Sequence, residues 1–326
     1  MSPTIDRTMD RPILYITRLL PQPVLEAIPK DYRILAGTTD QSPTTDELRR
    51  GFAEADAVIC TLSDAIDASL LSAATRLKIL ANYAVGYNNI DVPDATRRGV
   101  IVTNTPDVLT DATADLTWTL LLGMARRIVE GDRWIRRGGW PGWSPTQLLG
   151  ADVSGKTLGI VGMGRIGQAV AMRAGGFRMS VMYAGRHAVV PPQGFAWAHH
   201  PLDTVLTQSD FLSLHVPLNE TTYHLIGERE LRMMKSTAYL INTSRGAVID
   251  ESALITALQT RSIAGAALDV YAQEPHVPAA LTSLSNVVLL PHLGSATLDT
   301  RVHMGLICLT NIVAVLEGRP APNHVN

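Results

Sequence analysis

Three residues in the second half of the chain, Arg245, Glu274 and His292, together have the chemistry that a ketone reduction requires. Hydride addition to a carbonyl leaves an alkoxide, and a histidine that titrates near neutral pH can donate the missing proton. A carboxylate beside the imidazole stabilises its protonated form, and an arginine can bind a substrate carboxylate and polarise the adjacent carbonyl. We therefore identify all three as candidate catalytic residues. The alternative for each is structural: a helix cap for Glu274, a surface ion pair for Arg245 and packing for His292.

A second candidate site is the G-x-G-x-x-G pattern formed by Gly162, Gly164 and Gly167. An apolar run precedes it and a segment with helical spacing follows it, as in the phosphate-binding turn of a dinucleotide-binding unit. The first glycine permits the tight turn, the second lets the backbone approach a pyrophosphate, and the third lets the helix pack on the strand. The free N–H groups at the start of the helix would bind the phosphates. The alternative is a glycine-rich turn without a ligand.

The end of the next predicted strand indicates which dinucleotide is bound. NAD-binding units have an acidic residue about 20 positions after the glycine turn, where it binds the ribose 2′-hydroxyl. No acidic residue lies between Asp152 and Asp203, and Gly185 and Arg186 stand at or just beyond the place of the missing carboxylate. Since a guanidinium can bind a 2′-phosphate through charge-assisted hydrogen bonds, we infer NADP(H), with NAD(H) as the weaker alternative. Arg186 could instead be a solvated surface charge.

The elements that must position these residues alternate along the chain. Short β-rich runs are separated by helix-length segments, which predicts βαβ units and parallel sheets with helices on both faces. A helix over residues 110–134 and a loop over 138–150 separate two series of predicted strands. One sheet of all these strands would be unusually wide, so we expect two α/β domains. The predicted strands are 12–17, 33–36, 57–60, 78–82 and 100–103, followed by 157–161, 179–184, 211–215, 237–242, 265–270 and 286–290.

The composition excludes several classes of protein. The 326 residues are 46% hydrophobic and 18% charged, which excludes a disordered chain, and the net charge of −2 gives no reason to expect a nucleic acid as partner. Cys60 and Cys308 are too few for a disulfide scaffold. No apolar run reaches the roughly 18 residues of a membrane span, and the N-terminus lacks the apolar segment of a secretory signal. We expect a soluble cytoplasmic protein with no membrane partner and no metal site.

Longer motifs around these residues carry a resemblance to a known family. They are AVGYNNID at 84–91, the glycine turn, LHVPL at 214–218, the segments around Arg245 and Glu274, and PHLGSAT at 291–297. With these motifs in this order from about Pro12 to Pro322, the chain resembles the D-isomer-specific 2-hydroxyacid dehydrogenases. The segments LSD at 62–64, NTPDVLT at 104–110 and GR at 185–186 are most similar to the NADP-preferring glyoxylate/hydroxypyruvate reductases of that family.

The resemblance implies an α/β fold with two Rossmann-like, doubly wound parallel-sheet domains. The cofactor domain, residues 104–292, would be inserted into the substrate-binding domain, residues 1–103 and 293–326. The implied activity is reduction of a small 2-oxo acid, glyoxylate or hydroxypyruvate, by NADPH to the D-2-hydroxy acid. A 2-ketogluconate reductase or another D-2-hydroxyacid dehydrogenase is an alternative, and a nucleotide-sensing corepressor is a distant one.

The resemblance also assigns roles to single residues. His292 would be the general acid/base, Glu274 its partner, and Arg245 the ligand of the substrate's carboxylate and carbonyl. The substrate-binding residues would be Val85 and Gly86, through backbone N–H groups, together with Leu62, Ser63 and Trp143. The cofactor-binding residues would be Gly162, Gly164, Arg165, Ile166, Gly167, Gly185, Arg186, Val216, Pro217, Thr222, Thr243, Asp269, Thr110 and Gly294. Of these, Asp269 would hold the nicotinamide amide, and Thr110 would lie near the nicotinamide.

A homodimer formed through residues 110–150 is a further implication of the resemblance. In the most similar branch of the family, a tryptophan of this loop reaches the active site of the neighbouring subunit. Trp143, or else Trp140, could do so here. The alternative for both is an aromatic side chain within the dimer core.

Overall fold

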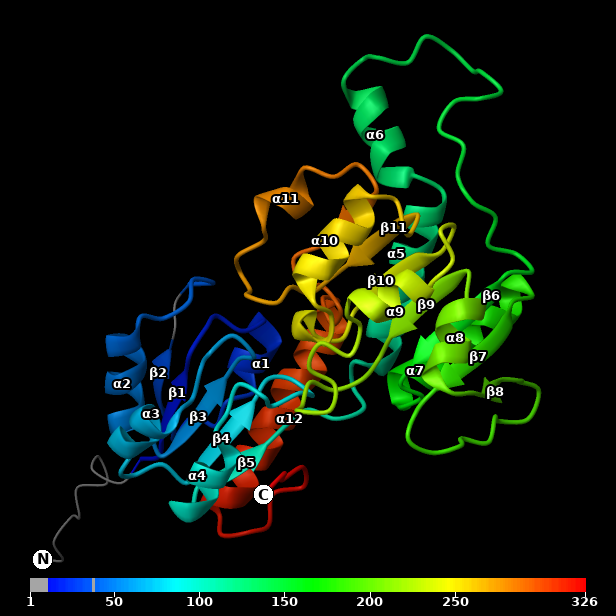
Figure 1. Cartoon of the computed structure of the whole chain (residues 1–326). Coiled ribbons are helices and arrows are strands. Elements are labelled where there is room, and N and C mark those ends of the chain that lie inside the picture. The colour runs from blue at the N-terminus through cyan, green and yellow to red at the C-terminus, as the bar shows by residue number, and fades with distance from the viewer. Residues whose placement is uncertain (1–10, 37–38) are drawn as a thin grey trace, which may run out of the picture. The chain divides into compact units, whose positions relative to one another are not determined.

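The computed structural model describes residues 11–36 and 39–326 and divides the chain into two compact units. Unit 1 is the described part of Met1–Leu109 together with Ala296–Asn326, and unit 2 is Thr110–Ser295. Each unit is built on one parallel sheet with helices packed on it (Figure 1). The predicted α/β class, with two Rossmann-like parallel-sheet domains, is therefore confirmed.

The transitions between the units lie at 109/110 and 295/296, and not at the predicted 103/104 and 292/293. Thr105 stays with unit 1, because its N–H donates to Ala84 O at 2.9 Å. Leu293 and Gly294 stay with unit 2, because their N–H groups donate to the Asp269 carboxylate. Hydrogen bonds between segments far apart in the sequence thus set both boundaries.

The sheet of unit 1 has five parallel strands in the order β2-β1-β3-β4-β5. The chain passes from β1 to β2 on one side and then to β3 on the other, so the order reverses between β1 and β3. The strands are β1 (Ile13–Ile16), β2 (Arg33–Ala36), β3 (Ala57–Cys60), β4 (Ile79–Asn82) and β5 (Ile101–Thr103). The helices are α1 (Gln22–Glu26), α2 (Thr45–Glu54), α3 (Ala68–Ala73), α4 (Val92–Arg97) and α12 (Leu298–Leu316).

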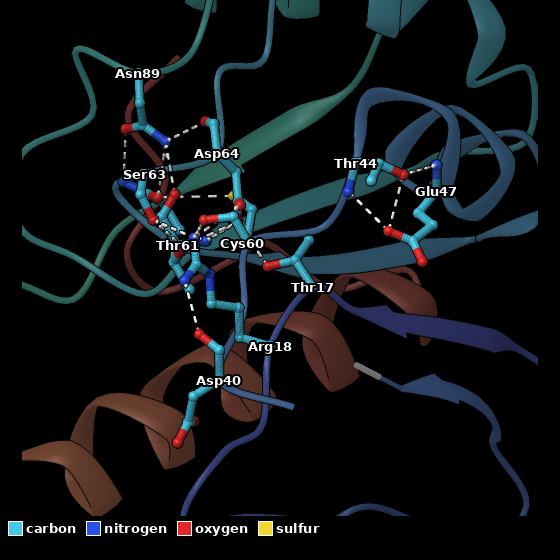
Figure 2. Close-up of polar contacts among 12 residues, drawn as sticks. Thr17, Arg18, Asp40, Thr44, Glu47, Cys60, Thr61, Ser63, Asp64 and Asn89 are labelled. Atoms are coloured by element: carbon cyan, nitrogen blue, oxygen red, sulfur yellow. Dashed lines mark hydrogen bonds and ion pairs between the residues drawn. The ribbon is translucent and has the colours of Figure 1, made fainter. Parts of the chain in front are cut away.

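Side-chain caps fix where several unit 1 helices begin. Thr44 and Glu47 form a reciprocal capping box before α2: the Thr44 hydroxyl accepts from Glu47 N at 3.3 Å, and the Glu47 carboxylate accepts from Thr44 N at 2.7 Å (Figure 2). Asp67 and Asp91 cap α3 and α4 by accepting from the N–H three residues later. Each cap binds an N–H that has no partner within its helix.

Helix α12 packs on the unit 1 sheet and supplies part of its core. Met304, Cys308 and Ile312 are buried in one cluster with Ile79 and Ala81 of β4. Among the described residues, α12 is the helix whose length and apolar composition would suit a membrane span. Its buried side chains pack against β4.

The sheet of unit 2 has seven parallel strands in the order β12-β11-β10-β9-β6-β7-β8. The strands are β6 (Thr157–Val161), β7 (Ser180–Ala184), β8 (Ala198–His199), β9 (Phe211–Leu214), β10 (Tyr239–Asn242), β11 (Gly265–Leu268) and β12 (Val287–Leu289). The helices are α5 (Thr110–Ala125), α6 (Ile128–Arg136), α7 (Arg165–Ala174), η2 (Gly175–Phe177), α8 (Leu202–Gln208), α9 (Glu228–Met233), η3 (Gly246–Val248), α10 (Glu251–Gln259) and α11 (Ala279–Thr282).

The unit 2 sheet is buried on both faces. Successive residues of β10, Leu240 and Ile241, belong to two different clusters of buried side chains, as the alternation of a strand requires. One cluster includes Trp118 of α5 and Val170 of α7, and the other includes residues of α8, α9 and α10. Burial on both faces explains why these strands are continuous apolar runs in the sequence.

The prediction of a single helix over residues 110–134 is wrong. Two helices, α5 and α6, occupy this stretch, and the break lies at Arg127, whose φ of +53° is left-handed. The Arg127 guanidinium binds the Glu130 carboxylate at 2.7 and 3.0 Å, and Ala125 O accepts from Ala151 N at 2.8 Å. These contacts fix a turn where the apolar spacing of the sequence continues without interruption. Figure 1 shows α6 and the loop after it extending away from the unit 2 sheet.

Candidate active site

The three candidate catalytic residues lie together in unit 2. Arg245 follows β10, Glu274 follows β11 and His292 follows β12, and these strands are neighbours in the sheet. The imidazole Nδ1 of His292 lies 2.8 Å from Glu274 Oε2. Arg245 is close enough to Glu274 for the charge of each to alter the pKa of the other. The triad therefore occupies the edge of the sheet where open α/β sheets bind ligands.

The electrostatics of the triad fix the tautomer of its histidine. Burial raises the pKa of the Glu274 carboxyl, but the hydrogen bond and charge of His292, aided by Arg245, hold it below its usual value. Because an ionised carboxylate only accepts hydrogen bonds, His292 Nδ1 must carry a proton. The second ring nitrogen, Nε2, is then the one that can exchange a proton with a substrate. Burial lowers the pKa of the Arg245 guanidinium, and the charge of Glu274 opposes this effect.

Asp269 holds the turn that carries His292. Its carboxylate accepts from Leu293 N at 2.6 Å and from Gly294 N at 2.8 Å, and its carbonyl oxygen accepts from His292 N at 2.9 Å. His292 itself has a left-handed φ of +56°, which an L-residue adopts only when neighbouring contacts stabilise it. Burial raises the pKa of the Asp269 carboxyl. The residue expected to hold the nicotinamide amide therefore also anchors the turn of His292.

A second histidine at this edge of the sheet, His215, follows β9 and is not suited to be the general acid. Its Nε2 lies 2.8 Å from Ser213 Oγ, and burial lowers the pKa of His215 to about 3. An imidazole with such a pKa is neutral at physiological pH and has no imidazolium proton to donate.

Two threonines of α5, which the sequence does not single out, contact the loops that follow β10 and β12. The Thr113 hydroxyl donates to Gly294 O at 3.1 Å, and Thr117 Oγ1 lies 2.9 Å from Thr243 Oγ1. Thr113 and Thr117 are four residues apart, so they lie on one face of the helix. Two hydroxyls with this spacing in an otherwise apolar helix are the feature of the sequence from which such contacts could have been predicted.

Gly246 allows the loop of Arg245 to contact the loop of Glu274. A Cβ at position 246 would lie 1.8 Å from the carbonyl carbon of Tyr271. Tyr271 N in turn donates to Glu274 Oε1 at 3.0 Å, and the Tyr271 hydroxyl donates to Leu290 O at 2.9 Å. The sequence shows a glycine after Arg245 but does not show which backbone it touches.

The three glycines of the turn between β6 and α7 meet different surroundings. Gly162 has a left-handed φ of +98°, and a Cβ there would lie 2.6 Å from His215 O; a Cβ at Gly167 would lie 2.2 Å from Gly162 O. At Gly164, the N-cap of α7, a Cβ would meet no described heavy atom within 4 Å. The first glycine thus permits the turn, and the third permits the close packing of α7. The second leaves open space beside the N-terminus of α7. Arg165 and Ile166 form the first turn of α7.

The other predicted cofactor residues follow strands of the same sheet. Val216, Pro217 and Thr222 follow β9, Thr243 follows β10 and Gly294 follows β12, whereas Thr110 is the first residue of α5. The loop after β9 is fixed by Thr222 Oγ1, which donates to Pro217 O at 2.6 Å.

Gly185 and Arg186 come directly after β7. The sequence predicts that this position contacts the 2′ group of the cofactor's ribose. The carbonyl oxygen of Gly185 lies 2.9 Å from His199 Nε2, and the Arg186 side chain is exposed. The structure therefore leaves the Arg186 guanidinium in contact with solvent. Within residues 11–36 and 39–326, no group of His, Cys, Asp and Glu side chains could hold a metal ion.

The predicted substrate residues of unit 1 lie in two loops. Leu62 and Ser63 follow β3, and Val85 and Gly86 follow β4. The carbonyl oxygens of Val85 and Gly86 accept from side-chain amides, at 2.8 Å from Asn104 and 2.9 Å from Asn82. Their N–H groups donate no hydrogen bond within the part of the chain that the structure describes. Two neighbouring N–H groups without partners are suited to bind a carboxylate.

The two candidate tryptophans lie in the loop after α6. Trp143 is 77% exposed, and Trp140 is 49% exposed, with its Nε1 donating to Gln147 Oε1 at 3.4 Å. A cavity of about 450 Å³ is lined by residues of α5, α6 and β12, among them Arg127 and Val288. None of the candidate catalytic residues is part of its lining.

Comparison with known proteins agrees with this geometry. Residues 118–294 match the family model described as the D-isomer specific 2-hydroxyacid dehydrogenase, NAD binding domain. A glyoxylate reductase from Thermococcus litoralis is 49% identical over 321 residues, which cover 97% of each chain. Another glyoxylate reductase, from Aeropyrum pernix, is 47% identical over 324 residues, covering 98% of this chain and 97% of the relative.

Solved structures show the same similarity. A Thermus thermophilus protein has a TM-score of 0.90 at 42% identity, covering 96% of this chain and 100% of its own. An NADPH-dependent glyoxylate/hydroxypyruvate reductase from Sinorhizobium meliloti, solved with NADP and malonate, has a TM-score of 0.84 at 35% identity, covering 97% of both chains. Both identities are high enough for the similarity to extend beyond the fold.

Proposed function

Since the chain belongs to the D-isomer-specific 2-hydroxyacid dehydrogenase family, we propose that it reduces glyoxylate or hydroxypyruvate with NADPH. The observation that carries this proposal is the His292–Glu274 pair, 2.8 Å apart, with Arg245 beside it at the edge of a sheet that has a dinucleotide-binding turn. The similarity to glyoxylate reductases along nearly the whole chain supports the substrate class.

His292 supplies the proton in this proposal. The Glu274 carboxylate accepts the Nδ1–H, so the protonated imidazole presents its Nε2–H to the carbonyl oxygen of the substrate. When bound, the reduced nicotinamide supplies a hydride to the carbonyl carbon. The oxygen takes the proton from Nε2, the ketone or aldehyde becomes a hydroxyl group, and His292 is left neutral. Glu274 stabilises the charged imidazolium before the transfer.

The carboxylate of the substrate is recognised by charge and by backbone donors. The Arg245 guanidinium binds the carboxylate and polarises the adjacent carbonyl, which favours the negative charge that develops on the oxygen. The N–H groups of Val85 and Gly86 are further donors, and their lack of partners within the described residues supports this role.

We further propose NADP(H) as the preferred cofactor, with NAD(H) used less well. Arg186 is exposed directly after β7, and the carboxylate that would repel a 2′-phosphate is missing from residues 153–202. The S. meliloti relative that was solved with NADP supports the same preference. Gly185 keeps the backbone free of a side chain at this point.

The proposed assembly is a homodimer formed through residues 110–150. Ile128, Ile135 and Leu149 are apolar and more than half exposed in a single chain, and a second copy would cover them. Trp143 is the residue of this segment proposed to reach the partner's active site. We propose a cytoplasmic location, which the two buried cysteines, both free of disulfides, support.

A cofactor and substrate grid tests the proposed function. The oxidation of NADPH and of NADH is followed at the nicotinamide absorbance band with glyoxylate, hydroxypyruvate, pyruvate and 2-ketogluconate. Fast turnover of NADPH with the first two acids is the expected result. Turnover with 2-ketogluconate alone would change the substrate and keep the mechanism, and a preference for NADH would contradict the role of Arg186. Absence of turnover with every pair would refute the proposal.

A further inference from the structure

Arg18 connects two loops at the carboxyl end of the unit 1 sheet. Its Nη1 donates to Asp40 O at 3.1 Å, and its Nη2 donates to Ser42 Oγ at 2.6 Å and to Ser63 Oγ at 2.8 Å. The side chain is 19% exposed, and the buried Asp64 carboxylate lies 4.0 Å from Nη2. Figure 2 shows Arg18 extending from the Asp40 side toward Thr61 and Ser63. The guanidinium is thus held in place, and its Nη2 hydrogens are directed at two serine hydroxyls.

The loop that carries Ser63 lies where this sheet would bind a ligand. Ligands of open α/β sheets bind outside the carboxyl ends of the strands, at the point where the strand order reverses. In unit 1 that point lies between β1, which Arg18 follows, and β3, which residues 61–64 follow. Ser63 is exposed at this point, whereas Asp64 beside it is buried.

The hydrogen bonds around Ser63 make it a donor. Thr61 Oγ1 and Thr17 Oγ1 donate to Asp64 Oδ2 at 3.0 and 2.6 Å, so the Thr61 proton is already used. Arg18 donates into Ser63 Oγ, and the single proton of Ser63 is directed at Thr61 Oγ1, 3.0 Å away, when no ligand is bound. An oxygen of a ligand can take the place of Thr61 as acceptor. The charge of the guanidinium strengthens this donor, because it polarises the hydroxyl.

The Ser63 loop is also tied to the loop of the proposed carboxylate-binding N–H groups. Asn89 Nδ2 donates to the carbonyl oxygen of Asp64 at 3.1 Å (Figure 2). Asn89 Nδ2 lies 3.4 Å from Asn82 Oδ1, and Asn82 Nδ2 lies 3.5 Å from Asn89 Oδ1. Asn82 Nδ2 also donates to Gly86 O at 2.9 Å. This chain of amides fixes Ser63 relative to Gly86 within unit 1. A substrate held at Gly86 by its carboxylate would therefore have a fixed position relative to the loop of Ser63.

We propose that Ser63, with its proton directed by Arg18, selects 2-oxo acids that have an oxygen atom on C3. The inference rests on the proposed function, in which Val85 and Gly86 bind the substrate's carboxylate. Hydroxypyruvate has a C3 hydroxyl that accepts from Ser63, pyruvate has a methyl group in its place, and glyoxylate has no C3. Ser63 therefore favours hydroxypyruvate over pyruvate and does not affect glyoxylate. Arg18 is a positioning residue that acts through Ser63.

The test compares kcat and KM of the full-length enzyme for the three acids with saturating NADPH. Ser63→Ala should lower the ratio of kcat/KM for hydroxypyruvate to that for pyruvate about tenfold, mainly through the KM for hydroxypyruvate. The kcat/KM for glyoxylate should change by less than about twofold, since no contact to C3 is lost. Ser63→Thr keeps a hydroxyl and should keep the preference. Ser42→Ala is the matched control, because it removes the other hydroxyl bound by the same nitrogen of Arg18.

The role of Arg18 is tested through the same ratio. Arg18→Lys keeps the positive charge but cannot donate to Asp40, Ser42 and Ser63 from one planar group. It should lower the ratio in the same direction as Ser63→Ala. If Arg18 acts through Ser63, the double variant loses no more of the ratio than Ser63→Ala alone. A general folding defect would instead lower kcat/KM for all three acids equally and reduce the thermal unfolding midpoint.

An unchanged ratio in Ser63→Ala, or an equal loss in Ser42→Ala, would overturn the inference. So would a wild-type enzyme that reduces glyoxylate but does not prefer hydroxypyruvate to pyruvate, and in that case the proposed function would stand. Absence of turnover with all three acids would overturn the proposed function and the inference with it. If the losses of this ratio in Arg18→Lys and Ser63→Ala add up in the double variant, the role given to Arg18 is overturned.

Discussion

Gly246→Ala should disable the enzyme by separating the loops that carry Arg245 and Glu274. A Cβ at position 246 would lie 1.8 Å from the carbonyl carbon of Tyr271, 2.0 Å from its oxygen and 2.4 Å from Ala272 N. Since ordinary Cβ contacts begin near 3.4 Å, the two backbones would have to move apart by more than about 1.5 Å. Neither atom group belongs to a flexible side chain, so no rotamer change can relieve the overlap.

The size of the effect follows from this displacement. Arg245 directly precedes the substituted residue, and Glu274 is bound to Tyr271 N, so the movement separates the two catalytic groups. A misplacement of about 1 Å costs about 10²-fold in rate, so kcat/KM for glyoxylate should fall at least about 100-fold. Overpacking costs about 1–3 kcal/mol, which lowers the unfolding midpoint but leaves most molecules folded.

Steady-state kinetics, thermal unfolding and NADPH binding by fluorescence together test this prediction. NADPH affinity should be kept, because the glycine turn follows a different strand. Gly175→Ala is the matched control: its φ is −56°, and a Cβ there meets no described atom within 4 Å, so its activity should stay within about twofold of wild type. If folded Gly246→Ala is as active as this control, the close contact of the two loops does not position the triad, and the reasoning fails.

Three further predictions concern the cofactor and the catalytic turn. Arg186→Ala should raise the KM for NADPH at least about tenfold more than that for NADH, and equal effects would exclude a contact to the 2′-phosphate. The pKa of Glu274 is held below its ordinary value of 4.5, so its ionised form stabilises the fold above that value, and the contribution is lost as the pH falls through the lower folded-state pKa. In urea titrations, the difference in unfolding free energy between wild type and Glu274→Gln should therefore shrink from about pH 7 to about pH 3, whereas a constant difference would contradict the lowered pKa of Glu274. Asp269→Asn replaces one acceptor of the turn that carries His292 by an NH₂ group, so kcat should fall about tenfold; an unchanged kcat would show that the carboxylate does not position this turn.

Much of the fold could be predicted because each strand of a parallel sheet that is covered on both faces leaves a recognisable apolar run in its own short segment of sequence. Strands such as Thr157–Val161 are buried on both faces and are continuous apolar runs, so they can be recognised without knowing which strands lie beside them. The glycine turn was visible for the same reason, since its three glycines serve a single strand–turn–helix unit. The break at Arg127 was not visible, because it depends on a contact with Ala151 across the following loop.

The candidate catalytic residues could be predicted only as a set of chemical types at the ends of strands. That His292 contacts Glu274 depends on β11 and β12 being neighbours, which no local pattern reveals. The anchoring role of Asp269 and the loop contact at Gly246 come from the same long-range pairing. The link from Arg18 to Ser63 likewise requires that β1 lies beside β3, which only the strand order shows.

The kinetics of His292→Ala test the central claim of a histidine acid most directly. The measurement is kcat for glyoxylate with saturating NADPH, together with NADPH affinity and the thermal unfolding midpoint of the variant. The account predicts a loss of about 10²- to 10⁴-fold in kcat, because the proton donor is removed, with NADPH affinity close to that of wild type. A folded variant that reduces glyoxylate at the wild-type rate would show that another group supplies the proton, and it would contradict the account.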